Sequence, residues 1–293
     1  MDGGDAVHIP ALIRETLFYL DPKPGDVIAD CTIGAGGHAA EILKAISPGG
    51  RLIGIDRDAE ILAIAERNLA SFAGSFELHQ ASFADLRQSL PGPLDGMLFD
   101  LGVSSLQLDR PERGFSFMAE GPLDMRMDPS AGVTAAEALR RLPEKELAEI
   151  IRTLGEERFA WRIAKAIKHA VKTTGLRTTS DLAEAVMRAV PRRSGKIHPA
   201  TRTFQALRIY VNRELDALAD ALREAPCLLK PGGRAVVISY HSLEDRIAKQ
   251  TFREQAKRGV VELLTKKPVR PQPDEIERNR RSRSARLRAV KKL

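Results

Sequence analysis

Apolar positions in the chain follow two spacings that alternate over the first hundred residues. Short continuous apolar runs indicate buried strands, the first of them at 27–29, and helical spacing follows, as at 39–46. Glycine and proline separate the segments, for example Pro48-Gly49-Gly50. Further strand-like runs lie at 51–56, 76–79, 94–100, 234–240, 260–264 and 285–290. This alternation predicts an α/β fold with a mostly parallel sheet, edged by a hairpin near the C-terminus.

The middle of the chain has no strand pattern. From Ala135 to Val190 the apolar spacing is helical, which predicts a helical insertion in the α/β core. A further helix, Thr203–Glu224, is expected to lead back to the core. We therefore divide the chain into a core, 1–108 and 199–293, and an inserted helical domain, 109–198, that recognises the substrate.

A glycine-rich turn follows the first predicted strand in the stretch Asp30-Cys31-Thr32-Ile33-Gly34-Ala35-Gly36-Gly37-His38. Glycine has no Cβ and tolerates positive φ, so a ligand can lie against the backbone there. The next strand ends in Asp56, which is 22 residues after Gly34. An acid about 20 residues after such a loop is typical of a carboxylate that binds ribose hydroxyls. The pattern predicts a nucleotide-type site, and a tight turn beside a solvated Asp is the alternative.

The glycine spacing bears on which nucleotide binds. The dinucleotide fingerprint places its third glycine about three residues after the second, whereas here Gly36, Gly37 and His38 are consecutive. A pyrophosphate would have no clear cradle in this loop. We favour S-adenosylmethionine, with Asp56 on its ribose, and NAD is the alternative cofactor.

A second acid, Asp100, ends the strand predicted at 94–100, and a long polar segment follows it, 101–128. A loop of more than about 15 residues in a compact domain is usually functional or disordered. The many apolar and aromatic residues in this one argue against disorder. Phe83 follows another predicted strand, and it either covers an adenine ring or belongs to the core.

Charge is concentrated in two stretches, although the net charge of the chain is only +7. Residues 278–293 contain eight Lys and Arg and no acid, and residues 187–213 are basic without an acid. Such stretches on a near-neutral body favour a polyanionic partner. Solvated basic surfaces are the alternative.

The sequence argues against a membrane protein, a secreted protein and a zinc protein. No apolar run approaches the ~20 residues of a membrane span, and the first residues do not resemble a signal peptide. Two cysteines, Cys31 and Cys227, make neither a disulfide framework nor a zinc site. We expect a cytoplasmic protein without a membrane or a metal.

Several long motifs resemble one known family. They are GAGGHA, DLGVSSLQLD with ERGFSF and GPLDMRMD, HPATRTFQALRIYVNREL, ISYHSLEDR and NRRSRSARLR. Together they resemble the bacterial MraW/RsmH family, from about His8 to the C-terminus. The resemblance implies a class I methyltransferase (Rossmann-like) core with S-adenosylmethionine as donor. It also implies a cytosine exocyclic amine (N4) in small-subunit (16S) ribosomal RNA, near the decoding centre, as acceptor, so that the partner is this RNA or the assembled subunit.

The resemblance also implies which residues bind the cofactor. By position, Asp56 holds the ribose and Phe83 lies near the adenine. The remaining contacts implied are Gly36, Gly37, His38, Asp100 and Gln107. Leu106 and Tyr240 depart from the family pattern, which has proline and phenylalanine at these positions.

The cytosine amine is a poor nucleophile, because its lone pair is conjugated with the ring. An acceptor at one N–H would help to free this lone pair and take up positive charge. We expect Asp100 or a neighbouring backbone carbonyl to be this acceptor. His241 is a second catalytic candidate and His198 a weaker one, since a single histidine is more often structural. Cations expected to hold RNA phosphates are Arg126, Arg202, Arg208 and the arginines of 278–293.

Two other functions fit parts of the pattern. One is an NAD-dependent oxidoreductase, against which the glycine loop and the lack of a second nucleotide-binding half argue. The other is a non-catalytic RNA-binding or ribosome-assembly protein with a relic cofactor site. The sequence leaves the oligomeric state open, with a homodimer as one option.

Overall fold

The computed structural model describes residues 10–191 and 198–293. The chain forms two compact units. The first comprises Met1–Gly102 and Leu215–Leu293, and the second comprises Val103–Glu214. In the part that the structure describes, no helix has the length and apolar character needed to cross a bilayer.

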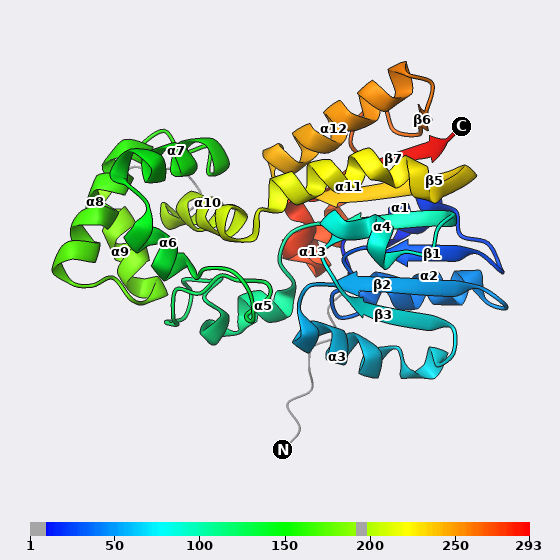
Figure 1. Ribbon diagram of the computed structural model, residues 1–293, viewed down its shortest axis with the longest axis horizontal. Helices are drawn as coiled ribbons and strands as arrows, with labels where there is room; N and C mark the ends of the chain where they lie inside the picture. The colour runs from blue at the N-terminus through cyan, green and yellow to red at the C-terminus, as the bar shows by residue number, and fades with distance from the viewer. Residues whose placement is uncertain (1–9, 192–197) are drawn as a thin grey trace. The chain divides into compact units, whose positions relative to one another are not determined.

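A seven-stranded sheet forms the centre of the first unit (Figure 1). Its strand order is β3-β2-β1-β4-β5-β7-β6, and the first five strands are parallel. β7 pairs antiparallel with both β5 and β6, as expected for a hairpin edge. The strands are β1 (Val27–Asp30), β2 (Arg51–Asp56), β3 (Phe76–Gln80), β4 (Leu94–Asp100), β5 (Leu229–Ser239), β6 (Val261–Leu263) and β7 (Arg286–Lys292).

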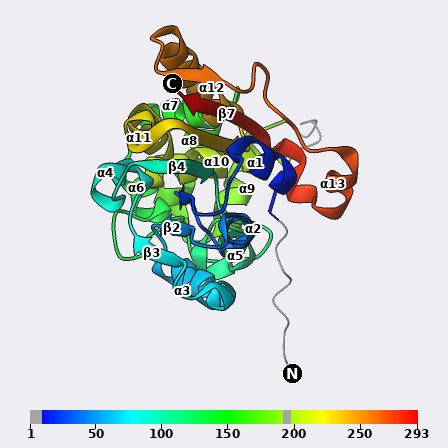
Figure 2. The same cartoon turned by 90° about the vertical axis from the view of Figure 1, so that its right-hand side faces the viewer.

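Helices cover both faces of this sheet, with α4 and α11 on one side of β4 and α1 on the other (Figure 2). Side chains alternate along each strand, so that Met97 and Phe99 of β4 pack with one group of helices and Leu98 with the other. The first group is α4 (Leu86–Ser89), α11 (Glu214–Leu228) and α12 (Ser242–Lys257). The second is α1 (Ile13–Leu20), α2 (Gly37–Ile46) and α3 (Ala59–Asn68). The predicted α/β fold with a mostly parallel sheet is confirmed.

The second unit is helical and has a hydrophobic core of its own. Leu139, Leu147, Ile163, Leu182 and Leu207 are completely buried there, each on a different helix. The helices are α5 (Ser105–Asp109), α6 (Ala135–Arg141), α7 (Glu144–Leu154), α8 (Ala160–Thr173), α9 (Thr179–Ala189) and α10 (Ala200–Asn212).

The unit boundaries differ from the predicted 109–198 insertion. The predicted helix Thr203–Glu224 is two helices, because Arg213 adopts a left-handed conformation (φ 51°) and ends α10. Phe204 and Leu207 of α10 pack in the core of the second unit. The second unit therefore extends to Glu214, and the return to the sheet is made by α11 alone.

Candidate active site

Three carboxylates lie at one edge of the sheet in the first unit. Asp30 ends β1, Asp56 ends β2 and Asp100 ends β4, and these strands are neighbours in the order β2-β1-β4. The carboxyl ends of parallel strands are where ligands bind in open α/β sheets. Asp56 and Asp100 were predicted for this site, but Asp30 was not. Its signal is the same as theirs, an acid at the end of a buried strand.

The glycine loop is held against this edge. Gly34 donates its backbone N–H to Asp56 Oδ2 at 3.1 Å, and the N–H of Asp58 donates to Oδ1 at 3.0 Å. The buried Ile33 packs over Gly54 of β2, where an added Cβ would lie 2.2 Å from Ile33 Cδ1. Gly36 has φ +87° and immediately precedes α2, whose first residue is Gly37. Asp56 thus ties the loop to β2.

Asp100 has polar contacts on both carboxylate oxygens. The Tyr240 hydroxyl donates to Oδ1 at 2.9 Å, and His38 Nδ1 lies 3.4 Å from Oδ2. His38 Nε2 lies 3.0 Å from the carbonyl oxygen of Ala11. A carbonyl oxygen only accepts, so Nε2 carries a proton. In neutral His38 the lone pair on Nδ1 then faces Asp100.

The three strand-end acids all have raised pKa values. Burial raises the pKa of Asp30 to about 7, with further increases from the charges of Asp100 and Asp56, against a hydrogen bond from Thr32. Burial likewise raises the pKa of Asp56 to about 6. Burial raises the pKa of Asp100 to about 7, opposed by the Tyr240 hydrogen bond. An edge with several carboxyl groups in low-dielectric surroundings favours a cationic ligand, which would lower these pKa values.

Phe83 follows β3 at the same end of the sheet and begins the short helix Phe83–Asp85. Its ring packs edge-to-face on Phe99 with centroids 6.3 Å apart, and the Arg57 guanidinium lies 5.1 Å from its centroid. Phe83 is only partly buried. A contact between this ring and an adenine stays a prediction.

His241 is the N-cap of α12 and forms a capping box with Glu244. Its Nε2 lies 3.1 Å from Glu244 Oε1, and the N–H of Tyr240 donates to Glu244 Oε2 at 2.8 Å. The imidazole therefore has a local structural role that positions the start of α12 after β5. A catalytic role for His241 stays a prediction.

Gln107 belongs to the second unit, where it forms a capping box with Ser104 at the start of α5. Its role in cofactor binding stays a prediction. His198 lies in the same unit and stacks on Phe117 with ring centroids 4.5 Å apart.

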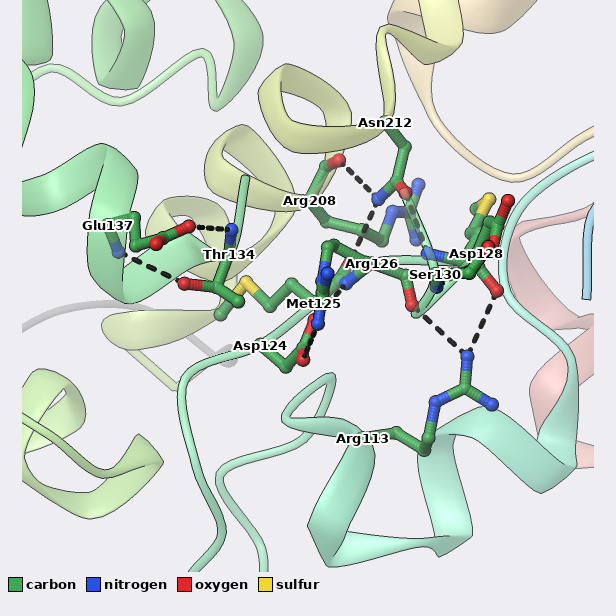
Figure 3. A network of polar contacts seen from close by, with 11 residues as sticks. Arg113, Asp124, Met125, Arg126, Asp128, Ser130, Thr134, Glu137, Arg208 and Asn212 are labelled. Atoms are coloured by element: carbon green, nitrogen blue, oxygen red, sulfur yellow. Dashed lines mark hydrogen bonds and ion pairs between the residues drawn. The ribbon is translucent and has the colours of Figure 1, made fainter. Parts of the chain in front are cut away.

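The segment that follows Asp100 is ordered by a polar network (Figure 3). Arg113 donates to the carbonyl oxygens of Arg126 and Met127 at 3.1 and 3.0 Å. Asn212 of α10 accepts from the Met127 N–H at 2.8 Å and donates to the Met125 carbonyl at 2.7 Å. These bonds fix the loop to the helical core of the second unit.

Several cations predicted to hold phosphates have acidic partners within their own unit. Arg126 binds Asp124 through two nitrogens, Arg208 binds Glu214 in the same way, and Arg202 lies 3.6 Å from Glu157. In the C-terminal stretch, Arg288 pairs with Asp245 and Arg278 with Asp274. The acids that meet Arg202 and Arg288 are distant in sequence, whereas those that meet Arg126, Arg208 and Arg278 lie two to six residues away. Phosphate binding by these five arginines stays a prediction. Arg192, Arg193 and Lys196 lie outside the described residues.

Comparison with known protein families identifies the enzyme class of this chain. The MraW methylase family matches residues 5–293. The chain belongs to this family. The predicted resemblance is confirmed, and the protein is an S-adenosylmethionine-dependent methyltransferase rather than an NAD-dependent oxidoreductase.

Relatives of this methylase are similar over almost their whole length. The chain is 48% identical to a protein of Acidobacterium capsulatum, with 97% of this chain and 98% of the relative covered. It is 51% identical to a protein of Sorangium cellulosum, with 98% and 91% covered. Both relatives are named ribosomal RNA small subunit methyltransferase H. Among solved structures, PH0851 matches with a TM-score of 0.50 and 12% identity, covering 98% of this chain and 47% of PH0851; this likeness concerns the fold alone.

Proposed function

We propose that this methyltransferase acts on small-subunit ribosomal RNA and methylates the exocyclic amine (N4) of a cytosine near the decoding centre. The names of the relatives support the RNA substrate, and the motif resemblance supports the cytosine. The observation that carries the proposal is the contact of Asp100 with His38 and Tyr240 beside the glycine loop.

The carboxyl ends of β1, β2 and β4, with their three acids, suit S-adenosylmethionine as ligand. This cofactor supplies an electrophilic methyl group on a positively charged sulfonium. Three carboxyl groups with raised pKa values accommodate positive charge better than a pyrophosphate. Asp56 binds the ribose and Phe83 the adenine. The other cofactor-binding residues are Gly36, Gly37, His38, Asp100 and Gln107.

Asp100 accepts the proton that the amine loses. A carboxylate hydrogen-bonded to one N–H of the amine withdraws the proton and frees the nitrogen lone pair. The Nδ1 of His38, 3.4 Å from Asp100 Oδ2, can then take over the proton, because Nε2 is already committed to the Ala11 carbonyl. Tyr240 holds the other carboxylate oxygen, so that Asp100 keeps a fixed orientation.

The second unit recognises the RNA. Its independent core and the ordered loop anchored by Arg113 and Asn212 give a rigid support on which a binding surface can be preorganised. The partner is small-subunit ribosomal RNA or the assembled subunit.

The test is methyl transfer from labelled S-adenosylmethionine to small subunits that lack the modification, with naked ribosomal RNA in parallel. Nucleoside analysis is expected to place the label in an amine-methylated cytidine. The better of the two substrates would show when in assembly the enzyme acts. Label in another nucleoside, or no label despite measurable binding of the donor, would contradict the proposed acceptor.

A further inference from the structure

One exposed face of α8 in the second unit combines cations with an aromatic ring. Trp161, Arg162, Lys165, His169 and Lys172 are all exposed, and their spacing puts them on one stripe about 100° wide. The opposite side of the helix is buried in the core of the unit through Ala160, Ile163, Ala164 and Ile167. α8 packs against α7 and α9 (Figure 1). The stripe consists of residues on the face that α8 presents to solvent.

This stripe carries positive charge without compensation. The segment from Arg158 to Arg177 contains no acidic residue. Lys168 differs from the other cations of this segment, because its ammonium group donates to the carbonyl oxygens of Leu139 and Leu142 at the end of α6. It therefore has a structural role. In the described parts of the chain, no ion pair involves Arg158, which lies just before α8, or Arg162, Lys165 and Lys172 of α8, and all four are exposed.

The neighbouring helices differ in this respect. Arg152 of α7 pairs with Glu149 at 2.6 Å, and Arg188 of α9 pairs with Glu184 at 2.9 Å. Both pairs lie on exposed helix surfaces, as the α8 stripe does. The absence of carboxylates is therefore a property of α8 and not of the whole unit's surface.

Aromatic rings organise one end of the stripe. The guanidinium groups of Arg158 and Arg162 lie 4.6 and 6.0 Å from the ring centroid of Phe159. Two guanidinium groups held at one ring without a carboxylate make a site that attracts an anion. Next to them Trp161 keeps 56% of its surface exposed. Cations for phosphates and a free aromatic face for a base are the combination that single-stranded nucleic acids require.

We propose that this α8 face binds a single-stranded segment of the ribosomal RNA substrate. Arg158, Arg162, Lys165 and Lys172 contact phosphates, and Trp161 stacks on an unpaired base. The inference rests on the proposed function, because it takes the RNA as the partner and names the surface that receives it. An acidic protein partner would use the cations but would not require a base to stack on Trp161.

The first experiment uses the fluorescence of Trp161, which is the only tryptophan in the chain. The full-length protein is titrated with a short single-stranded RNA of mixed sequence. Stacking on a base is expected to quench the emission in a saturable way, and a duplex RNA of equal length is expected to quench much less. Equal quenching by both, or none, would overturn the stacking role.

The second experiment compares two double variants of equal charge. R162Q/K165Q removes two cations of the stripe, whereas R152Q/R188Q removes two paired cations from the flanking helices. Each lost phosphate contact lowers the salt slope of binding to single strands by about 0.7. We expect a decrease of about 1.4 and an affinity loss of about tenfold for R162Q/K165Q, with little change for the control. Equal effects of both variants would contradict a specific α8 site.

A third variant separates stacking from charge. W161A is expected to weaken RNA binding about tenfold without changing the salt slope, and W161F is expected to restore most of the affinity. Methyl transfer to small subunits then distinguishes this inference from the proposed function. If the unmodified protein methylates subunits and R162Q/K165Q does so with an unchanged KM, the α8 site is wrong and the proposed function stands. If the unmodified protein transfers no methyl group to ribosomal RNA, the proposed function itself fails.

Discussion

The two units place their charged groups in opposite ways. In the first unit, carboxylates lie at adjacent strand ends, in surroundings that raise the pKa values of Asp30 and Asp100 to about 7. In the second unit, cations lie on the exposed face of one helix. Sheet topology determines the first arrangement and helical period the second. The comparison indicates that the two proposed roles have different physical requirements. The proposed proton acceptor needs low-dielectric surroundings, whereas the proposed RNA-binding surface needs exposed cations without carboxylate partners.

The second unit contains a contrast of its own. Arg208 and Glu214 form an ion pair whose side chains are only 15% and 8% exposed, whereas the cations of the α8 face are exposed and have no carboxylate partner among the described residues. The fold therefore separates basic residues that already have a carboxylate partner from basic residues that are exposed without one among the described residues.

The largest effect is expected for Asp100→Asn, which removes the proton acceptor but keeps the shape of the side chain. Turnover should fall about 10²–10⁴-fold, the usual contribution of a positioned acid or base, while affinity for RNA stays unchanged. Single-turnover methyl transfer measures this. Asp85→Asn is the matched control, because Asp85 is an exposed acid of the same unit. Full turnover by the Asp100 variant would end the assignment of chemistry to the strand-end acids.

Arg208→Gln should cost the second unit about 3 kcal/mol of unfolding free energy, because it leaves Glu214 buried without its partner. Denaturant unfolding measures the loss. Arg188→Gln, which breaks an exposed pair, should cost less than about 1 kcal/mol. If Arg208→Gln instead changed the salt slope of RNA binding with no loss of stability, Arg208 would be a phosphate ligand after all.

Asp30→Asn should stabilise the ligand-free protein by up to about 4 kcal/mol at pH 8. The folded-state pKa of Asp30 is about 7, above its ordinary value near 3.8. Its contribution to stability is therefore full below pH 4 and is lost as the pH rises to 7 and above. The variant should flatten the pH dependence of thermal unfolding between pH 4 and 8. An unchanged pH dependence would mean that Asp30 ionises normally in the folded protein.

The smallest effect is expected for Tyr240→Phe, about threefold to tenfold in turnover, corresponding to about 1 kcal/mol for one hydrogen bond. The Tyr240 hydroxyl lowers the pKa of Asp100, so its removal should raise that pKa. Because Asp100 acts as a carboxylate, the rise of kcat/KM with pH should move to higher pH. A loss of activity with no movement of the pH profile would assign Tyr240 a packing role only.

Much of the first unit follows from local sequence. Apolar runs predicted the parallel strands, and the glycine loop with Asp56 and Asp100 predicted a cofactor site at their ends, because strand ends and turns leave short-range signals. The family resemblance added the methyl donor. Asp30 was not predicted, although it also ends a buried strand. It directly precedes the glycine-rich turn, and the sequence does not distinguish a site residue from a turn residue at that position.

The sequence by itself determined the α/β class, the helical character of the second unit and the methyltransferase family. Only the tertiary structure decided which charges are free. Arg202 and Arg288 meet Glu157 and Asp245 through folding, whereas Arg162, Lys165 and Lys172 of α8 form no ion pair in the described chain. Ion pairing depends on distances of a few ångströms between segments that are remote in sequence, and no local pattern contains those distances. For the same reason, no local pattern shows the contacts of Asp100 with His38 and Tyr240, which form because the ends of β4 and β5 and the start of α2 lie together in the fold.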